Sequence, residues 1–283
     1  MRFRNEKAQI YVPDGTAVKS ALNRTTSLCI AAHQDDTEIM AYNAIAECYG
    51  VVDKWFTSVI VTDGAGSPRD GIYARFTDEE MKDVRAEEQN SAAKAGGYSA
   101  QVQLHYRSKE VKSIATPGLI AELEDIILAC SPQVVYTHNL ADKHDTHVAT
   151  VLRTISALRE LPKEKRPEKL YGMEVWRSLD WLADTEKAVF DASDHENVAA
   201  AVLGVFDSQI CGGKRYDLAA MGRRRANATF LGDHSIDTYS AAIIGIDMTE
   251  LLEDTTAKPE DFICKKIDAF KKDVAEKLGR MGK

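Results

Sequence analysis

The sequence predicts an α/β fold with a mostly parallel sheet and helices on both faces. Short apolar runs of strand length alternate along the chain with longer stretches of helical character. This alternation is typical of βαβ units, whose strands run parallel. The chain has 283 residues, 44% of them hydrophobic, which is enough for one large core or two modest ones.

Five short, mainly apolar segments are the predicted strands. Each is bounded by turn residues, and the first, LCIAA, is apolar throughout, as expected of a strand buried on both faces. The predicted strands are 28–32, 57–61, 102–106, 134–137 and 170–175.

Start and stop signals bound the predicted helices. The helix that begins at Thr37 stops before Gly50. Thr77-Asp-Glu-Glu80 is a capping box that starts a helix running to Gly96-Gly97, and Pro117 opens a further helix. The predicted helices are 37–49, 77–96, 117–130, 147–160, 196–206 and 261–278.

The polar connector LPKEKRPEK, at 161–169, is either a domain boundary or a loop between a helix and a strand. We favour the loop, because the segment after the connector is short for an independent core. The chain is therefore predicted to be a single α/β domain over residues 1–283.

Charge and cysteine content exclude several classes. The net charge of −8 argues against a nucleic-acid partner, and Arg223-Arg-Arg225 is interpreted as a solvated helix face. The five cysteines have no metal-like spacing, which suits a reducing compartment. No stretch reaches about 18 consecutive apolar residues. We expect a cytoplasmic protein with no membrane partner, and the sequence leaves a homo-oligomer open.

Two polar clusters lie directly after predicted strands. His33-Gln-Asp-Asp36 comes after 28–32, and His138 to His147 comes after 134–137. An isolated Asp here would most often be a helix N-cap, and an isolated His simply a polar loop residue. Because ligand sites of open α/β sheets lie beyond the carboxyl ends of the strands, two such clusters favour one shared site.

These residues are the components of a hydrolytic zinc site, which needs about three protein ligands. His33 and Asp36 are three residues apart, so both can reach one ion, and His147 can supply the third ligand. Zinc lowers the pKa of bound water towards about 7. Asp35 would then be free to act as general base, and His144 can donate a hydrogen bond to a developing oxyanion.

Several motifs resemble those of the PIG-L/LmbE family of zinc-dependent N-deacetylases. They occur in the family's order between about residues 28 and 210, and the first and fourth are the diagnostic ones. The motifs are AHQDDTE at 32–38, TDG at 62–64, RAEE at 85–88, THN to HDTH at 137–147, and SQ at 208–209.

The resemblance implies a Rossmann-like fold and hydrolysis of an N-acetyl group, typically on a glucosamine-type sugar. It implies that one Zn²⁺ per chain is bound by His33, Asp36 and His147. It also implies that Asp35 is the general base and that His144 stabilises the oxyanion. By the same resemblance Arg85 contacts the substrate; the alternative is an ion pair with Glu88 on an exposed helix.

Two positions depart from the family pattern. Gln34 replaces the usual Pro, and Thr146 replaces an Asp that helps to set the neighbouring His. We therefore expect Asp145 or Asp142 to orient His144 instead.

The predicted function is removal of an acyl group, acetyl in particular, from an amino-sugar conjugate by a metal-dependent amide hydrolase. One alternative is a metal-binding protein with little or no activity, for which Thr146 is the sign. Another is a non-haem Fe(II) enzyme, because two His and one carboxylate are also its ligand set. Loops 66–76 and 107–116 are expected to set specificity, Trp55, Trp176 and Trp181 are expected in the core, and His105, His195 and His234 are assigned no role.

Overall fold

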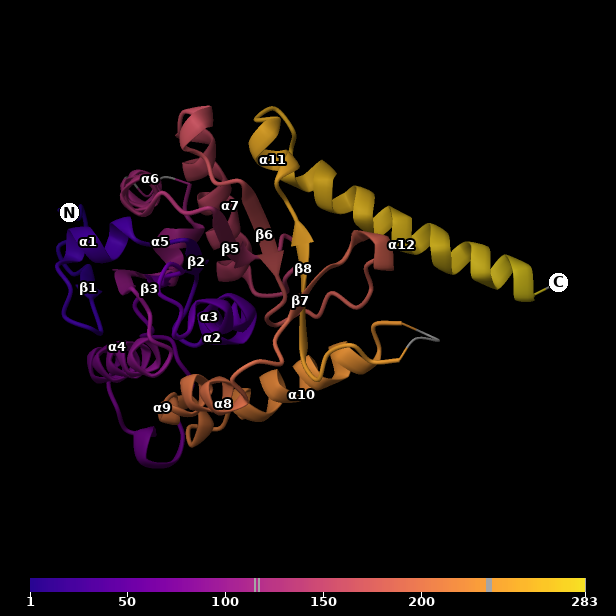
Figure 1. Ribbon diagram of the computed structural model, residues 1–283. Coiled ribbons are helices and arrows are strands. Elements are labelled where there is room, and N and C mark those ends of the chain that lie inside the picture. Colours follow the sequence, from indigo (N-terminus) through magenta and orange to yellow (C-terminus); the bar gives the residue numbers. More distant parts are fainter. Residues whose placement is uncertain (115, 117, 233–235, 283) are drawn as a thin grey trace.

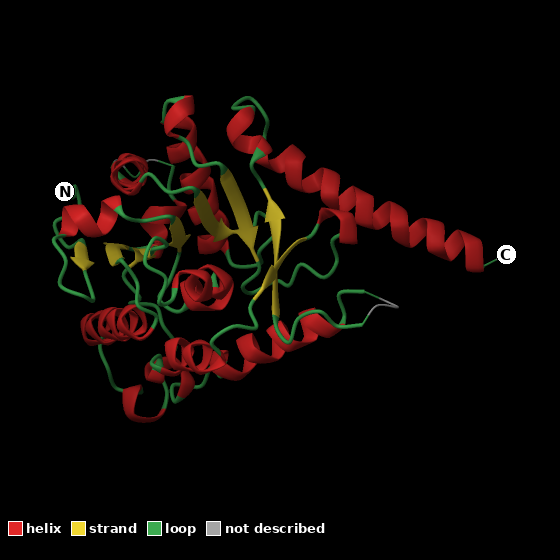
Figure 2. Cartoon of the chain, in the orientation of Figure 1, coloured by secondary structure: helices red, strands yellow, loops and turns green. Residues whose placement is uncertain are grey.

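The structure is a computed structural model that describes residues 1–114, 116, 118–232 and 236–282. Its strands form one eight-stranded sheet in the order β1-β4-β3-β2-β5-β6-β8-β7 (Figures 1 and 2). The strands are β1 (Gln9–Tyr11), β2 (Ser27–Ala31), β3 (Phe56–Thr62), β4 (Ala100–Tyr106), β5 (Val134–His138), β6 (Lys169–Met173), β7 (Ala188–Asp191) and β8 (Ala242–Asp247).

The centre of the sheet is parallel, as predicted. Strands β4, β3, β2, β5 and β6 pair in parallel, and they correspond to the five predicted strands. Chain order runs outward in opposite directions from β2 and β5, so the topological switch point lies between these two strands. β1, β8 and β7 pair antiparallel at the edges and were not predicted. The strands after the 161–169 connector, β6 to β8, extend the same sheet.

The sheet is buried on both faces. Along β2, Leu28 and Ile30 belong to one hydrophobic cluster, and Cys29 and Ala31 belong to a second. Side chains of a strand alternate between its faces, so the two clusters are the two sides of one sheet. This explains why the run is apolar at every position rather than at every second one.

Helices cover the two faces. In Figure 1, α6, α7 and α11 lie above the sheet, whereas α4, α8 and α10 lie below it, and α12 extends away from the body. The helices are α1 (Val18–Asn23), α2 (Asp36–Met40), α3 (Tyr42–Cys48), α4 (Asp78–Ala95), α5 (Ser108–Lys112), α6 (Leu119–Cys130), α7 (Asp145–Glu160), α8 (Glu196–Gly204), α9 (Asp207–Ile210), α10 (Tyr216–Thr229), α11 (Glu250–Glu253) and α12 (Pro259–Met281).

The predicted helix 37–49 is broken in two at Ala41, where φ is −123°. The buried guanidinium of Arg224 donates a hydrogen bond to the carbonyl of Glu38 at 2.5 Å. In an uninterrupted helix that carbonyl would accept the N–H of Tyr42 four residues later. A side chain from α10 thus takes the place of a backbone bond, which no local pattern could predict.

Other helix boundaries agree with the predictions to within two or three residues. The capping box of α4 is present, with Thr77 Oγ1 accepting the Glu80 N–H and the Glu80 carboxylate accepting the Thr77 N–H. The predicted start at Pro117, like His234, lies outside the described residues.

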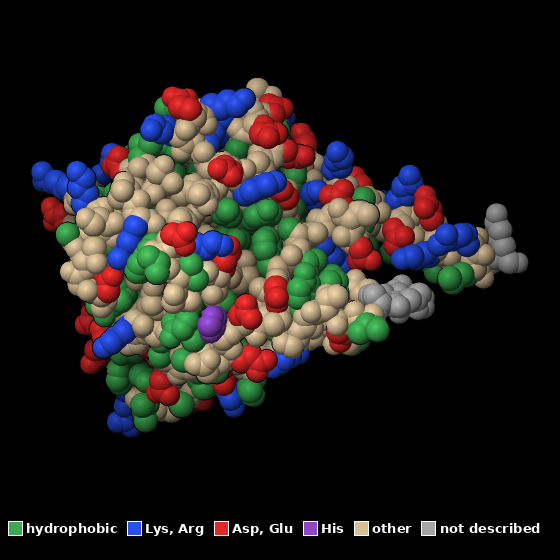
Figure 3. Space-filling view, in the orientation of Figure 1, with side chains coloured by type: hydrophobic (Ala, Val, Ile, Leu, Met, Phe, Trp, Pro, Cys, Tyr) green, Lys and Arg blue, Asp and Glu red, His purple; other side chains and the backbone are tan. Residues whose placement is uncertain are grey.

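The described surface carries charges of both signs. On the face drawn in Figure 3, acidic and basic side chains are interspersed. No helix in the described ranges is long and apolar enough to span a bilayer.

Candidate metal centre and active site

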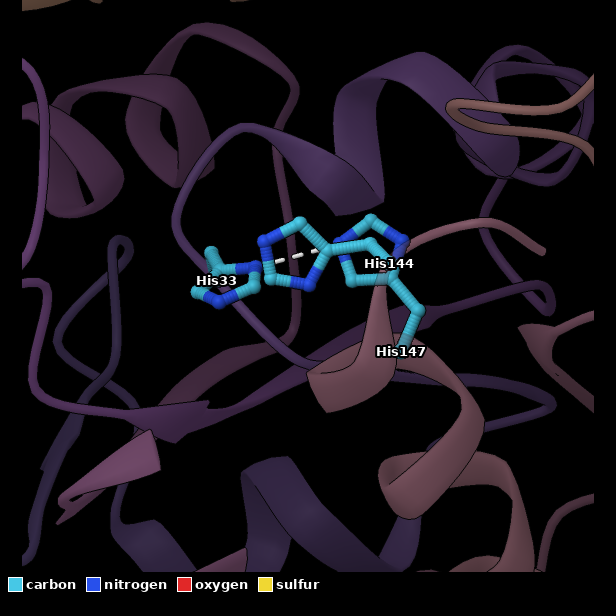
Figure 4. Close-up of side chains that lie close together, drawn as sticks. All are labelled: His33, His144 and His147. Carbon is cyan, nitrogen blue, oxygen red and sulfur yellow. Dashed lines mark hydrogen bonds between the residues drawn. The ribbon is translucent and has the colours of Figure 1, made fainter. Parts of the chain in front are cut away.

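The two predicted clusters meet at the switch point of the sheet. β2 and β5 are neighbours in the sheet and run parallel, so the residues that come after them lie at the same edge. His33 and Asp36 come from the turn between β2 and α2, while His147 lies in the first turn of α7. Figure 4 shows the rings of His33, His144 and His147 gathered at one place.

Three of the predicted ligand atoms form a compact triangle. Nδ1 of His33 lies 3.1 Å from Oδ2 of Asp36 and 3.1 Å from Nε2 of His147, and the latter two atoms are 3.2 Å apart. A tetrahedral zinc ion with bonds of about 2.0–2.1 Å separates its ligands by about 3.3 Å. The donor set and its spacing therefore fit one such ion.

The local field favours a cation at this point. Asp36 and His147 are buried, so solvent screens their charges little. Burial alone would lower the pKa of His147, but the carboxylates of Asp36 and Asp142 raise it to about 9. A site that holds a proton this firmly also attracts a metal cation, with which the proton competes.

His138 and His144 lie close enough to complete alternative sets, His33–His144–His147 and Asp36–His138–His147. Nε2 of His138 is already engaged, since it accepts the N–H of Ala32 at 2.8 Å. Burial keeps the pKa of His138 well below its ordinary value, so this ring is neutral. It stacks on His147 at a centroid distance of 3.9 Å and supports that ligand.

Asp142 supports His147 from the opposite side of the ring. Its Oδ1 lies 3.5 Å from Nδ1 of His147 and accepts the N–H of His144 at 3.0 Å. Its Oδ2 accepts the N–H of Trp176 at 3.1 Å. A carboxylate behind a metal-binding imidazole fixes its tautomer and increases its basicity.

His144 does not have the carboxylate partner that the sequence predicts. It is the N-cap of α7, and its Nδ1 accepts the N–H of Thr146 at 3.3 Å. Because Asp142 binds the His144 backbone and the His147 ring, it is not available to the His144 ring. Burial and the neighbouring His33 and His147 lower the pKa of His144 to about 4. A neutral ring whose Nδ1 accepts carries its proton on Nε2, and this N–H can donate a hydrogen bond.

Asp35 is held in a strained conformation beside the three ligand atoms. Its φ of 78° lies in the left-handed region, which non-glycine residues seldom adopt. Burial raises the pKa of its carboxyl to about 7, although the guanidinium of Arg85 opposes this with a 2.6 Å ion pair. Arg85 also donates to the carbonyl of Gln34 at 2.6 Å, so the turn is fixed at two points.

Arg85 is buried rather than on an exposed helix face. It is 2% exposed and forms a second 2.6 Å ion pair with Glu88, whose carboxylate accepts the N–H and hydroxyl of Ser208. Gly64 makes room for it, since a Cβ there would lie 2.9 Å from Cβ of Arg85. The structure thus joins the RAEE, TDG and SQ motifs in one network behind Asp35. A contact between Arg85 and substrate stays a prediction.

A pocket of about 500 Å³ opens in front of these groups. Sequence reasoning missed several of its walls, above all Trp176, which was assigned to the core. Trp176 comes after β6 at the carboxyl edge of the parallel sheet, and this position was the available signal. The lining residues are His33, Gln34, Asp35, Asp36, Thr62, Gly64, Gly66, Ser67, Pro68, Arg85, Ser108, Lys112, His144, Thr146, Trp176, Gln209, Lys214 and Tyr216.

Comparisons with solved structures show the fold. N,N'-diacetylchitobiose deacetylase from Pyrococcus horikoshii superimposes with a TM-score of 0.61 at 17% identity, covering 82% of this chain and 86% of that one. GalB, the 4-carboxy-2-hydroxymuconate hydratase from Pseudomonas putida KT2440, gives 0.57 at 19% identity, with 79% and 96% covered. A deacetylase and a hydratase share this architecture, so the fold alone does not select a reaction.

Sequence comparisons relate about half of the chain to known deacetylases. The chain is 29% identical over 159 residues to the uncharacterized deacetylase YaiS of Escherichia coli K12, which is 54% of this chain and 78% of that protein. The model of the PIG-L family, described as GlcNAc-PI de-N-acetylase, matches residues 28–158, the part that carries His33, Asp36, His144 and His147. Residues 28–158 of the chain are therefore similar to the PIG-L family.

Proposed function

We propose that this protein is a metal-dependent N-deacetylase that removes an acetyl group from an amino-sugar conjugate. The observation that carries the proposal is the triangle of His33, Asp36 and His147 donor atoms, with Asp35 and His144 on the same pocket. The family description and the name of the YaiS relative support deacetylation over other hydrolytic reactions.

The ligand set supports zinc as the metal, because two imidazoles and one carboxylate bind Zn²⁺ and leave a position open. When bound, the ion would polarise the amide carbonyl and acidify water. His33, Asp36 and His147 would hold it, and Asp142 and His138 would fix the orientation of His147.

Asp35 would accept the proton of the attacking water. Its carboxyl is buried, lines the pocket and keeps a fixed orientation through Arg85. A general base is most effective when its pKa lies near the working pH, and burial moves Asp35 in that direction.

His144 would donate a hydrogen bond from its Nε2–H to the amide oxygen as negative charge develops there. The N–H of Thr146 holds Nδ1 as an acceptor, so the ring keeps the required tautomer without a neighbouring carboxylate. This contact weighs against the non-catalytic alternative, which rested on the missing Asp at position 146.

The test has two measurements on the purified protein. Metal content by mass spectrometry should give about one equivalent of zinc, and acetate release should be detected from at least one N-acetylated amino sugar. Iron as the only metal, with oxygen uptake, would favour the Fe(II) alternative. Stoichiometric zinc with no acetate release across a broad panel would favour the non-catalytic one.

A further inference from the structure

One wall of the pocket comes from chain segments beyond the family match. Residues 28–158 match the family model, but Trp176, Gln209, Lys214 and Tyr216 also line the pocket. They come after β6 or lie around the turn between α9 and α10. This wall therefore lies outside the part of the chain that matches the family model.

The turn that carries Lys214 is rigidly built. The N–H of Lys214 donates to the carbonyl of Gln209 at 2.7 Å. Gly213 has a φ of +101°, and a Cβ at Gly212 would lie 1.8 Å from the carbonyl of Ser208, so neither glycine can be replaced without a shift. The turn thus presents Lys214 at a fixed place on the pocket wall.

Two ammonium groups converge on the indole of Trp176. Nζ of Lys214 lies 5.3 Å from the ring centroid, and Nζ of Lys143 lies 5.7 Å from it. Within the described ranges no ion pair joins either lysine to a carboxylate. A cation–π contact lowers the energy of an ammonium group but does not neutralise its charge. An anionic ligand would neutralise that charge.

The charge of the pocket points the same way. Lys112, at the end of α5, also lines it and has no carboxylate partner among the described residues. The two acidic residues of the lining are already engaged, Asp36 with the histidines and Asp35 with Arg85. The outer pocket is therefore cationic in a chain whose net charge is −8.

We propose that the substrate is an anionic amino-sugar conjugate, whose carboxylate or phosphate is bound by Lys214 and Lys112. The indole of Trp176 lies edge to face with Tyr216 at 6.0 Å, is half-buried, and offers an apolar surface for the sugar ring. This inference rests on the proposed function, since it places the acetamido group of the same sugar at the metal centre.

The test compares three probes that differ only at the anomeric position: N-acetylglucosamine 1-phosphate, the carboxymethyl glycoside and the neutral methyl glycoside. Binding is measured by titration calorimetry, and turnover by acetate release. One charge-assisted contact is worth about tenfold in affinity, so at least one charged probe should bind tenfold or more tightly than the methyl glycoside. The better of the phosphate and carboxymethyl arms identifies the anion.

Lys214→Met and Lys112→Met should each reduce the ratio of charged to neutral probe affinity by about tenfold. Lys109→Met is the matched control, because it removes the same charge from an exposed position on α5 that does not line the pocket. Equal affinity for charged and neutral probes, or binding of none of them, would overturn the proposal. So would an equal loss in the Lys109 control, which would indicate a bulk charge effect.

The two proposals fail in different ways. Selective binding of a charged probe, lost in the Lys214 and Lys112 variants but without acetate release, would retain the anion site and reject deacetylation. Acetate release at the same kcat/KM from all three probes would retain deacetylation and reject the anion site.

Discussion

Replacing Arg85 tests whether the buried network behind Asp35 holds the site together. Arg85→Met keeps an unbranched stem of similar bulk but removes the guanidinium. It leaves the carboxylates of Asp35 and Glu88, which are 5% and 7% exposed, without their 2.6 Å partner. Removing one member of a buried ion pair costs about 3–5 kcal/mol.

The matched control is Arg225→Met. Arg225 pairs with Glu196 at 2.8 Å, but the two side chains are 48% and 54% exposed. An exposed pair contributes about 0–1 kcal/mol. The free energy of unfolding should therefore fall by about 3 kcal/mol more in the Arg85 variant than in the Arg225 variant.

Urea unfolding monitored by circular dichroism measures this difference, with the same metal concentration for all variants because bound metal stabilises the folded state. If Arg85→Met does not accumulate as folded protein, Arg85→Lys should give a smaller loss, since an ammonium can satisfy one carboxylate. A loss in Arg85→Met within about 1 kcal/mol of the Arg225 control would refute the reasoning.

The same position separates two roles for Arg85. If it positions Asp35, Arg85→Lys should lower kcat more than it raises KM. A rise in KM with kcat unchanged would instead support the substrate contact that the family resemblance implies.

The remaining predictions concern the metal and the groups around it. His33→Ala and His147→Ala should each release the metal, measured by mass spectrometry after dialysis; retention of a full equivalent would contradict the ligand assignment. Asp35→Asn should keep the metal and lower kcat by about 10²–10⁴-fold, whereas loss of metal would make Asp35 a ligand. Asp142→Asn should weaken zinc binding by about 10–100-fold in chelator competition. Asp145→Asn, at an exposed position, should leave zinc binding unchanged. Equal effects of the two substitutions would show that Asp142 does not support His147.

The central strands were predictable because each carries its own signal. β2, β3 and β5 are buried along nearly their whole length, and their residues are mostly apolar or small at successive positions, whereas β4 alternates apolar residues with Gln101 and Gln103. The edge strands carry less information. β1 has three residues, and the direction of β8 depends on its pairing with β6, which lies about 70 residues earlier. Such pairings belong to the tertiary structure and leave no local pattern.

The proximity of the proposed ligands was predictable for a related reason. A parallel sheet brings the residues after β2 and β5 together, so proximity could be inferred from two short segments. The partner of His144 could not, because it depends on where α7 begins. The helix starts at Asp145 rather than near His147, which makes His144 the N-cap and turns the N–H of Thr146 towards its ring. Because the helix begins two residues earlier than predicted, His144 is held by a backbone N–H and not by the predicted carboxylate.

The pocket wall around Trp176 could not be predicted from the sequence at all. A tryptophan in a sequence is most often a core residue, and nothing near Trp176 in the chain contradicts that. The position of Trp176 depends on contacts with Lys214 and Tyr216, about 40 residues later in the chain. It also depends on Asp142, about 30 residues earlier, whose carboxylate accepts the backbone N–H of Trp176. The proposed catalytic groups lie in two short segments after neighbouring strands, whereas the pocket wall around Trp176 is assembled from distant segments. The sequence is therefore sufficient to propose the metal ligands and the general base. The residues that would contact the rest of the substrate can be proposed only from the structure.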